Sequence, residues 1–362
     1  MAVYELKPTK PAPMNTKGAW HWMHENLFSS PLNILLTCFG IGLLYLIIPP
    51  FLQWAYFDAT FIGETREDCA LNGGACWVFI HYKLDMFMYG FYPEVERWRL
   101  NLALGLFIGL IFALRYLKST WVKFALFNLF LTTVAILIIG GIFGLEKVPT
   151  DRWGGLMLTI VVATTGILVA FPIGIFLALG RASDLPIIRS ICVTYIEFIR
   201  GVPLITILFM SSIILPLFFP ENITFDKLLR ALIGIAMFEA AYIAENIRGG
   251  LQAIPKGQYE AADAIGLSYW QKIGLVILPQ ALKVAIPNLV GVSIALFQDT
   301  TLVLIIGLFD LLAMVRLSAA DSYWLGFETE GYVFVTFIFW FFCYSMSQFS
   351  QRLEKRFNTN LR

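Results

Sequence analysis

The chain has 362 residues, of which 58% are hydrophobic, 15% aromatic and only 14% charged, and its mean hydropathy is +0.73. Soluble globular proteins have about 25% charged residues, so this composition excludes a set of soluble domains. The net charge of +1 gives no basic field for nucleic acid, and five cysteines are too few for a disulfide scaffold. We therefore expect an all-α integral membrane protein without a nucleic-acid partner.

Apolar runs long enough to cross a bilayer core of about 30 Å recur along the chain. The first run begins after residue 30 and is too long for a cleaved signal peptide. The sequence predicts about eight transmembrane helices, at roughly 32–56, 98–117, 121–143, 154–180, 200–219, 229–247, 279–297 and 331–351. A shorter run at 299–315 is bounded by carboxylates, and we interpret it as re-entrant or interfacial.

The distribution of Lys and Arg predicts the orientation of these helices. Most of the 26 Lys and Arg residues fall in segments that share one side if the N-terminus is cytoplasmic. Together with an even number of spans, this predicts that both termini are cytoplasmic.

Two parts are expected: residues 1–153, with three spans, and residues 154–362, with five. The first part contains a large outside loop, about 57–97, with Cys69 and Cys76. Asn72-Gly73-Gly74 between them is a turn signal, and an oxidising compartment would allow the two cysteines to pair. The alternative is two free thiols near a loop tip.

No motif for covalent catalysis or nucleotide hydrolysis is found. The chain lacks a phosphate-cradling glycine-rich loop, a nucleophile elbow and a metal-binding His/Cys spacing, and His21 and His24 alone do not make a site. We therefore expect no metal, no cofactor bound by this chain and no enzymatic activity of its own. If ATP drives transport, then ATP and Mg bind to another chain.

Glu197 and Arg200 lie three residues apart on a predicted helix and can pair. Ionisable residues within spans are costly and are candidates for function, so both are candidate pathway residues. The alternative is a structural ion pair that fixes the entry to the next span. Glu245 and Arg248 have the same spacing and the same alternative.

The segment 248–279 is the most informative part of the sequence. Pro255-Lys256-Gly257 breaks the preceding helix, residues 258–265 favour a short helix with small side chains, and Gly266 is placed to end it. Pro279 suits the first turn of the following span. A short helix of this kind can be gripped closely by a partner; the alternative is a solvated connecting loop.

This segment resembles the EAA loop of ABC importer permeases. The matching residues are Glu260, Ala261, Ala262, Gly266, Leu278 and Pro279, whereas Val276 stands where the pattern usually has Ile. The stretches 195–204 and 244–258 are similar to those of the polar amino-acid permeases, and the resemblance covers about 157–352. With its three extra spans, the chain resembles the larger permease subunit of the general L-amino acid importers of proteobacteria and their glutamate/glutamine/aspartate/asparagine relatives.

The resemblance implies a type I ABC importer core in the last five spans and a location in the bacterial inner membrane. It implies a permease heterodimer that receives an L-amino acid from a periplasmic binding protein. Two ATPase subunits would close on ATP, and the EAA loop (248–279) would couple them to the permease.

Gln298-Asp299-Thr300-Thr301 lies where one apolar run stops and another starts. Broken helices at membrane depth expose polar groups to a cavity, and Asp299 with the threonine hydroxyls offers an acceptor and donors for a zwitterion. The family pattern has Lys at position 298, so a role for Gln298 does not carry over directly. For Asp299 the alternative is helix capping.

An ion-gradient-driven secondary transporter is the alternative function. It predicts an internal repeat with paired broken helices, and no second copy of the 248–279 segment is found. The sequence leaves open which amino acids are carried and what the three N-terminal spans do.

Overall fold

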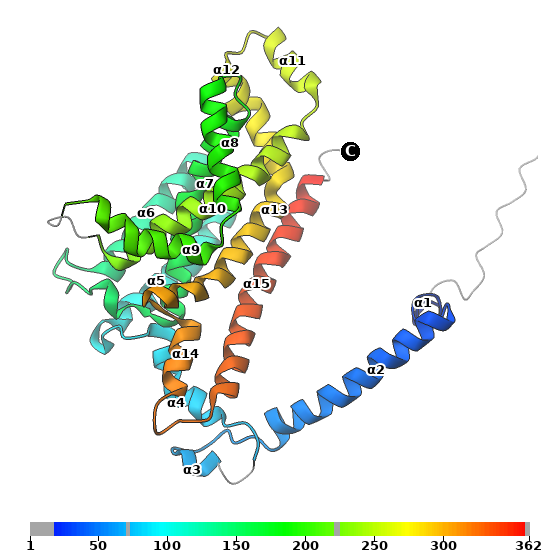
Figure 1. The fold of residues 1–362 in the computed structure, drawn as a ribbon, viewed down its shortest axis with the longest axis vertical. Helices are drawn as coiled ribbons and strands as arrows, with labels where there is room; N and C mark the ends of the chain where they lie inside the picture. The colour runs from blue at the N-terminus through cyan, green and yellow to red at the C-terminus, as the bar shows by residue number, and fades with distance from the viewer. Residues whose placement is uncertain (1–17, 70–72, 221–224, 359–362) are drawn as a thin grey trace, which may run out of the picture. The chain divides into compact units, whose positions relative to one another are not determined.

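The computed structural model describes residues 18–69, 73–220 and 225–358 (Figure 1). The chain forms two compact units, Met1–Val78 and Phe79–Arg362. This division differs from the expected one at residue 153, because the predicted second and third spans belong to the same unit as the core. The described part of the first unit begins with α1 (Ala19–Asn26) and α2 (Pro31–Leu52). Helix α2 continues into a π-helical turn, η1 (Gln53–Phe57), which precedes the loop with the two cysteines.

Helix α2 is the first predicted span. Ser30 caps it by accepting a hydrogen bond from the Asn33 N–H (3.2 Å), and Pro31 occupies its first turn. None of its residues is buried, although the helix is strongly apolar. Such a helix is compatible with a lipid environment on all sides.

A disulfide joins Cys69, at the end of α3 (Arg66–Cys69), to Cys76 across a Cα–Cα distance of 5.4 Å. Thr60 pairs with Cys76, and the Trp77 indole donates to the Ala55 carbonyl (2.8 Å). Asn72 of the expected turn lies outside the described residues. The loop is thus closed covalently and tied to the end of the first span.

The second unit is almost entirely helical. Its first elements are α4 (Trp77–Tyr89, which begins in the first unit), η2 (Glu94–Glu96), α5 (Arg97–Tyr116), α6 (Thr120–Ile139), η3 (Thr150–Arg152), α7 (Gly155–Arg181), α8 (Pro186–Arg200), α9 (Leu204–Phe209), η4 (Met210–Ile214) and η5 (Leu215–Phe218). They are followed by α10 (Lys227–Gln252), α11 (Lys256–Ala264), α12 (Tyr269–Gln271), η6 (Lys272–Ile277), α13 (Leu278–Asp299), η7 (Thr300–Ile306), β1 (Phe309–Asp310), α14 (Leu311–Ala319) and α15 (Glu328–Asn358).

Six helices of the described chain are long and apolar enough to cross a membrane. The expected span at 200–219 is instead the second arm of a pair, Pro186–Arg200 and Leu204–Phe218, that bends by 106°. The expected span at 229–247 is α10. This helix is long enough to cross a membrane, but charged residues are spread along its length, and it is not one of the six. The expected span at 279–297 is longer than predicted, Tyr269–Ile306, because a π-helical segment joins α12 to α13 ahead of Pro279.

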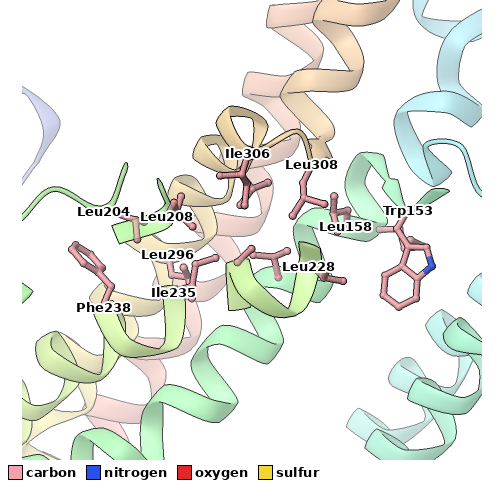
Figure 2. Close-up of a cluster of buried hydrophobic side chains, with 14 of the residues drawn as sticks. Trp153, Leu158, Leu204, Leu208, Leu228, Ile235, Phe238, Leu296, Ile306 and Leu308 are labelled. Atoms are coloured by element: carbon pink, nitrogen blue, oxygen red, sulfur yellow. The ribbon is translucent and has the colours of Figure 1, made fainter. Parts of the chain in front are cut away.

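Helix α10 packs against α7, α8 and α13 and forms the centre of the second unit. Glycines permit this close packing: a Cβ added at Gly174 would lie 2.5 Å from Ile243 Cγ2, and one added at Gly250 would lie 2.4 Å from the Ala281 carbonyl oxygen. Figure 2 shows side chains from α7, α9, α10 and α13 in one apolar cluster, including Leu158, Leu208, Leu228, Ile235 and Leu296.

Residues 299–315 do not form a span. After α13 the chain tightens into the 3-10 helix η7, turns at Gly307 with a left-handed φ of +75°, and pairs Phe309 and Asp310 with Gly154 and Gly155. Asp310 then caps α14 by accepting hydrogen bonds from the N–H groups of Leu312 (3.2 Å) and Ala313 (3.0 Å). The segment is a break between two helices, as expected for a re-entrant or interfacial stretch.

Candidate functional site: the coupling loop, an ion-pair cluster and a helix break

Helix α11 lies beyond the ends of α8 and α10 at one end of the second unit (Figure 1). Pro255 precedes it and Gly266, with a φ of +75°, follows it. The Gly266 N–H donates to the Asp263 carbonyl (3.0 Å) and the Leu267 N–H to the Ala262 carbonyl (3.2 Å). These two bonds form a Schellman motif, which requires a left-handed residue at the glycine position. The sequence prediction of a short helix closed by Gly266 agrees with this geometry.

Polar side chains brace α11 against the start of the next span. Lys272 forms an ion pair with Asp263 (2.6 Å), and the side-chain amide of Gln280 donates to the side-chain oxygen Oε1 of Gln258 (3.1 Å). Ala262 is buried, and burial also raises the pKa of the Tyr259 phenol above its ordinary value. The loop is therefore a fixed element rather than a free connection.

The predicted coupling residues divide into exposed and packed positions. Glu260 and Ala261 are exposed, Leu278 is half-buried and Pro279 is exposed at the start of α13. Among the described residues Glu260 forms no hydrogen bond or ion pair, and Asp263 and Gln258 make the bracing contacts instead.

Large apolar side chains stand exposed next to α11. Ile265 is 74% exposed and Trp270 is 67% exposed. In a loop that also carries Lys, Glu and Asp residues, such side chains are suited to contact with a protein partner rather than with lipid.

An ion-pair cluster joins the ends of α7, α8 and α10 near this loop. Glu245 on α10 contacts Arg248 in a bidentate pair (2.9 and 2.5 Å) and also lies 3.3 Å from Arg181 and 3.7 Å from Arg200. Glu197 on α8 contacts Arg181 (2.7 Å) and Arg200 (4.0 Å). The two predicted pairs are therefore parts of one cluster, which Arg181 connects across three helices.

This cluster favours a structural role for Glu197 and Arg200. Each side chain has an opposite charge within reach, and the Arg200 guanidinium also lies over the Tyr242 ring at 5.7 Å from its centroid. The Tyr195 hydroxyl donates to the Met237 carbonyl (2.8 Å) and further ties α8 to α10. Groups so engaged hold helix ends together and leave little capacity for a substrate.

The predicted pathway residues Gln298, Asp299 and Thr300 lie at the break between α13 and η7 and have different environments. Thr300 is fully buried and its hydroxyl donates to the Phe297 carbonyl (2.8 Å), so this hydroxyl is engaged within the chain and its role toward a substrate stays a prediction. Asp299 is half-buried and makes no side-chain capping bond to η7, so the capping alternative is not supported. Gln298 is exposed and contacts the Cys343 Sγ on α15 (3.7 Å).

A second carboxyl group lies close to this break. Glu239 on α10 is only 3% exposed and interacts electrostatically with Asp299. Buried carboxyl groups inside a membrane protein mark ion or substrate pathways, because burial without function is costly. The sequence gives no local signal that associates Glu239 with Asp299, which is 60 positions away in the chain.

Two further features could not be found from the sequence. Arg181 gives no local signal of its role, because both glutamates that it contacts lie on other helices. The same holds for Arg316 on α14, which lines an open groove together with Gln298 and residues of α15.

Comparisons with known proteins identify the family of this chain. Residues 170–359 match the family described as "Binding-protein-dependent transport system inner membrane component". The chain is 53% identical over 363 residues to the "Inner membrane amino-acid ABC transporter permease protein YhdY" of Escherichia coli (strain K12), covering 97% of this chain and 96% of that protein. It is 39% identical over 419 residues to the "Glutamate/glutamine/aspartate/asparagine transport system permease protein BztC" of Rhodobacter capsulatus, with the same coverage.

Among solved structures, the chain is similar to a "Crystal structure of an amino acid ABC transporter with histidines", with a TM-score of 0.49 and 28% identity over 56% of this chain and 92% of that one. The two permeases from Escherichia coli and Rhodobacter capsulatus match almost the full length of the chain, including its N-terminal part. They confirm the family expected from the EAA loop. The chain belongs to the family of binding-protein-dependent transport system inner membrane components.

Proposed function

We propose that this chain is the permease subunit of an ABC importer that carries L-amino acids across the inner membrane. The match over 97% of the chain to an amino-acid ABC transporter permease carries this proposal. The glycine-closed, braced helix α11 with exposed apolar neighbours supports it, because such an element can transmit force from a partner. A secondary transporter has no ATPase partner that helix α11 could contact, and the relatives argue against that alternative.

We further infer the division of labour among the subunits. Permeases of this family act with ATPase and binding-protein partners in general, and here we propose a heterodimer of two permeases with two ATPase subunits and a periplasmic amino-acid-binding protein. ATP and Mg would bind to the ATPase subunits. The coupling surface would consist of Glu260, Ala261 and the exposed side chains that follow Gly266.

In the proposed topology both termini and α11 face the cytoplasm, and the disulfide loop faces the periplasm. The distribution of Lys and Arg supports this orientation, and so does the disulfide, since oxidised cysteine pairs persist in the periplasm. The ion-pair cluster then lies at the cytoplasmic ends of α7, α8 and α10, directly behind the coupling loop. Movement of α11 would reach the transport core through this cluster.

Asp299 is proposed as the acceptor for the substrate ammonium. It lies at a helix break, it is half-buried, and a second carboxyl group is nearby. A cationic group of the substrate would neutralise charge that is costly in a membrane protein. Which amino acid is preferred would depend on the binding protein as well as on this site.

Reconstitution tests the proposed function. The chain is co-expressed with the neighbouring transport genes, purified as a complex, and placed in proteoliposomes with ATP inside and binding protein outside. We expect uptake of L-glutamine or L-glutamate only when ATP, the ATPase subunits and loaded binding protein are all present. Uptake by this chain alone, driven by a sodium or proton gradient, would contradict the proposal.

A further inference from the structure

A groove runs along α15 between α13 and α14. The side chains of one face of α15 form its wall, from Tyr332 to Cys343, and Arg316 of α14 and Gln298 of α13 face it from the other side. Its volume is about 640 Å³. Pockets for small molecules measure about 300–1,000 Å³, so the groove is large enough for an amino acid.

The lining of the groove is mostly apolar and includes a small set of polar groups. Gln298, Thr301, Arg316, Tyr332 and Thr336 contribute polar groups, between the aromatic surfaces of Phe339 and Trp340. Small-molecule sites are typically mostly apolar with a few polar groups that fix the orientation of the ligand, and this lining has that composition.

Arg316 is the one cationic side chain that lines the groove. It is exposed, and among the described residues it forms no hydrogen bond or ion pair. The nearest acidic group that influences it, Asp310, already accepts two backbone hydrogen bonds as the cap of α14. The Arg316 guanidinium therefore has its donors available for an anion, and arginine binds carboxylates through two parallel bonds.

The groove connects the end of α15 with the helix break. Tyr332 lies in the first turns of α15, whereas Cys343 lies about 16 Å further along, from a rise of about 1.5 Å per residue. Gln298 and Thr301 at its inner end flank Asp299 in the chain. In the proposed topology the first turns of α15 are periplasmic, so the groove leads from the periplasm to Gln298 and Thr301 at the helix break that also contains Asp299.

We propose that this groove is the outer half of the amino-acid pathway and that Arg316 binds the α-carboxylate of the substrate as it enters. The zwitterion is then oriented with its carboxylate on Arg316 and its ammonium toward Asp299. This inference rests on the proposed function, and it assigns a binding residue that the sequence did not single out.

Uptake by variants of Arg316 tests the assignment in the complete complex. With L-glutamine as the probe, delivered by loaded binding protein, we expect Arg316→Gln to reduce uptake about tenfold to a hundredfold, as for loss of a hydrogen bond to a charged group. Arg316→Lys keeps the charge and should retain part of the uptake. The matched control is Arg152→Gln, since Arg152 is also exposed and in the proposed topology lies on the same side, but outside the groove.

A native thiol provides a second measurement that does not depend on a substitution at Arg316. Cys343 lines the groove, and Cys38→Ser with Cys192→Ser leaves it as the free thiol of this chain. A sulfonated, membrane-impermeant methanethiosulfonate added from the periplasmic side should label Cys343. Saturating binding protein loaded with L-glutamine should slow this labelling.

The outcomes separate the two proposals. If the parent complex imports none of the common L-amino acids in the presence of ATP and loaded binding protein, the proposed function fails. If the parent imports but Arg316→Gln matches the Arg152→Gln control, only the assignment of Arg316 is wrong. If Cys343 resists the charged reagent in both resting and nucleotide-trapped complexes, lipid or a partner chain covers the groove and the pathway assignment is wrong.

Discussion

Substitution of Gly266 separates two reasons for needing glycine at the end of the coupling helix. Its φ of +75° penalises a side chain in any environment, by about 1–2 kcal/mol for an ordinary L residue and less for Asn or Asp. Apart from its chain neighbours, no atom of the residues that the structure describes lies within 4 Å of a Cβ added at Gly266, so a side chain causes no clash with them. Any steric effect must therefore come from a partner.

The two reasons predict different rankings. If backbone strain dominates, Gly266→Ala should be worse than Gly266→Asn, because asparagine tolerates the left-handed region better than alanine. If a partner surface packs against Gly266, both Gly266→Asn and Gly266→Asp should be worse than Gly266→Ala, because their side chains are larger. Since the proposed ATPase contact is close, we expect the second ranking.

Uptake and ATP hydrolysis should be measured side by side on purified complexes in proteoliposomes. We expect Gly266→Asp to leave the chain inserted and to reduce ATPase retention or uncouple hydrolysis from uptake. The ion pair of Lys272 with Asp263 holds the loop in the variant, so membrane insertion and the amount of chain should match the parent. If all three variants assemble and transport like the parent, the loop is a connector and the coupling role is refuted.

Three further results are expected. A maleimide should miss Cys69 and Cys76 on denatured, unreduced protein and label both after reduction; labelling without reductant would contradict the disulfide. Glu245→Gln keeps a side-chain acceptor but removes the negative charge that pairs with three arginines, at a side chain that is 22% exposed. We expect about 1–3 kcal/mol loss of stability to unfolding in mixed detergent micelles, whereas a loss below about 0.5 kcal/mol would reduce the cluster to independent surface pairs. Asp299→Asn should lower uptake about tenfold to a hundredfold while stimulation of the ATPase by loaded binding protein persists; unchanged uptake would remove Asp299 as a ligand.

The ion-pair cluster illustrates the limit of local reasoning. The spacing of Glu197 with Arg200, and of Glu245 with Arg248, predicts two separate pairs within single helices. Only the packing of α7 against α8 and α10 brings Arg181 between the two glutamates, and it converts two short-range pairs into one contact among three helices. No spacing rule contains this information, because Arg181 lies 16 positions from Glu197 and 64 from Glu245.

The sequence by itself determined the features that depend on short stretches of chain. Composition and run length predicted a helical membrane protein, since a bilayer requires long apolar helices with internally bonded backbones. Pro255 and Gly266 predicted the limits of the coupling helix, since they act on their own backbone dihedrals. The EAA-loop resemblance then predicted the family.

Only the tertiary structure decided which distant side chains meet and which ones are free. It buried the Thr300 hydroxyl against its own helix, left Glu260 exposed, and placed Glu239 near Asp299. It also determines the bend of 106° between the helices Pro186–Arg200 and Leu204–Phe218, and it forms the groove that Arg316 lines. The physical reason is that burial and pairing are set by the packing of helices against one another, and that packing depends on close contacts between residues far apart in the chain.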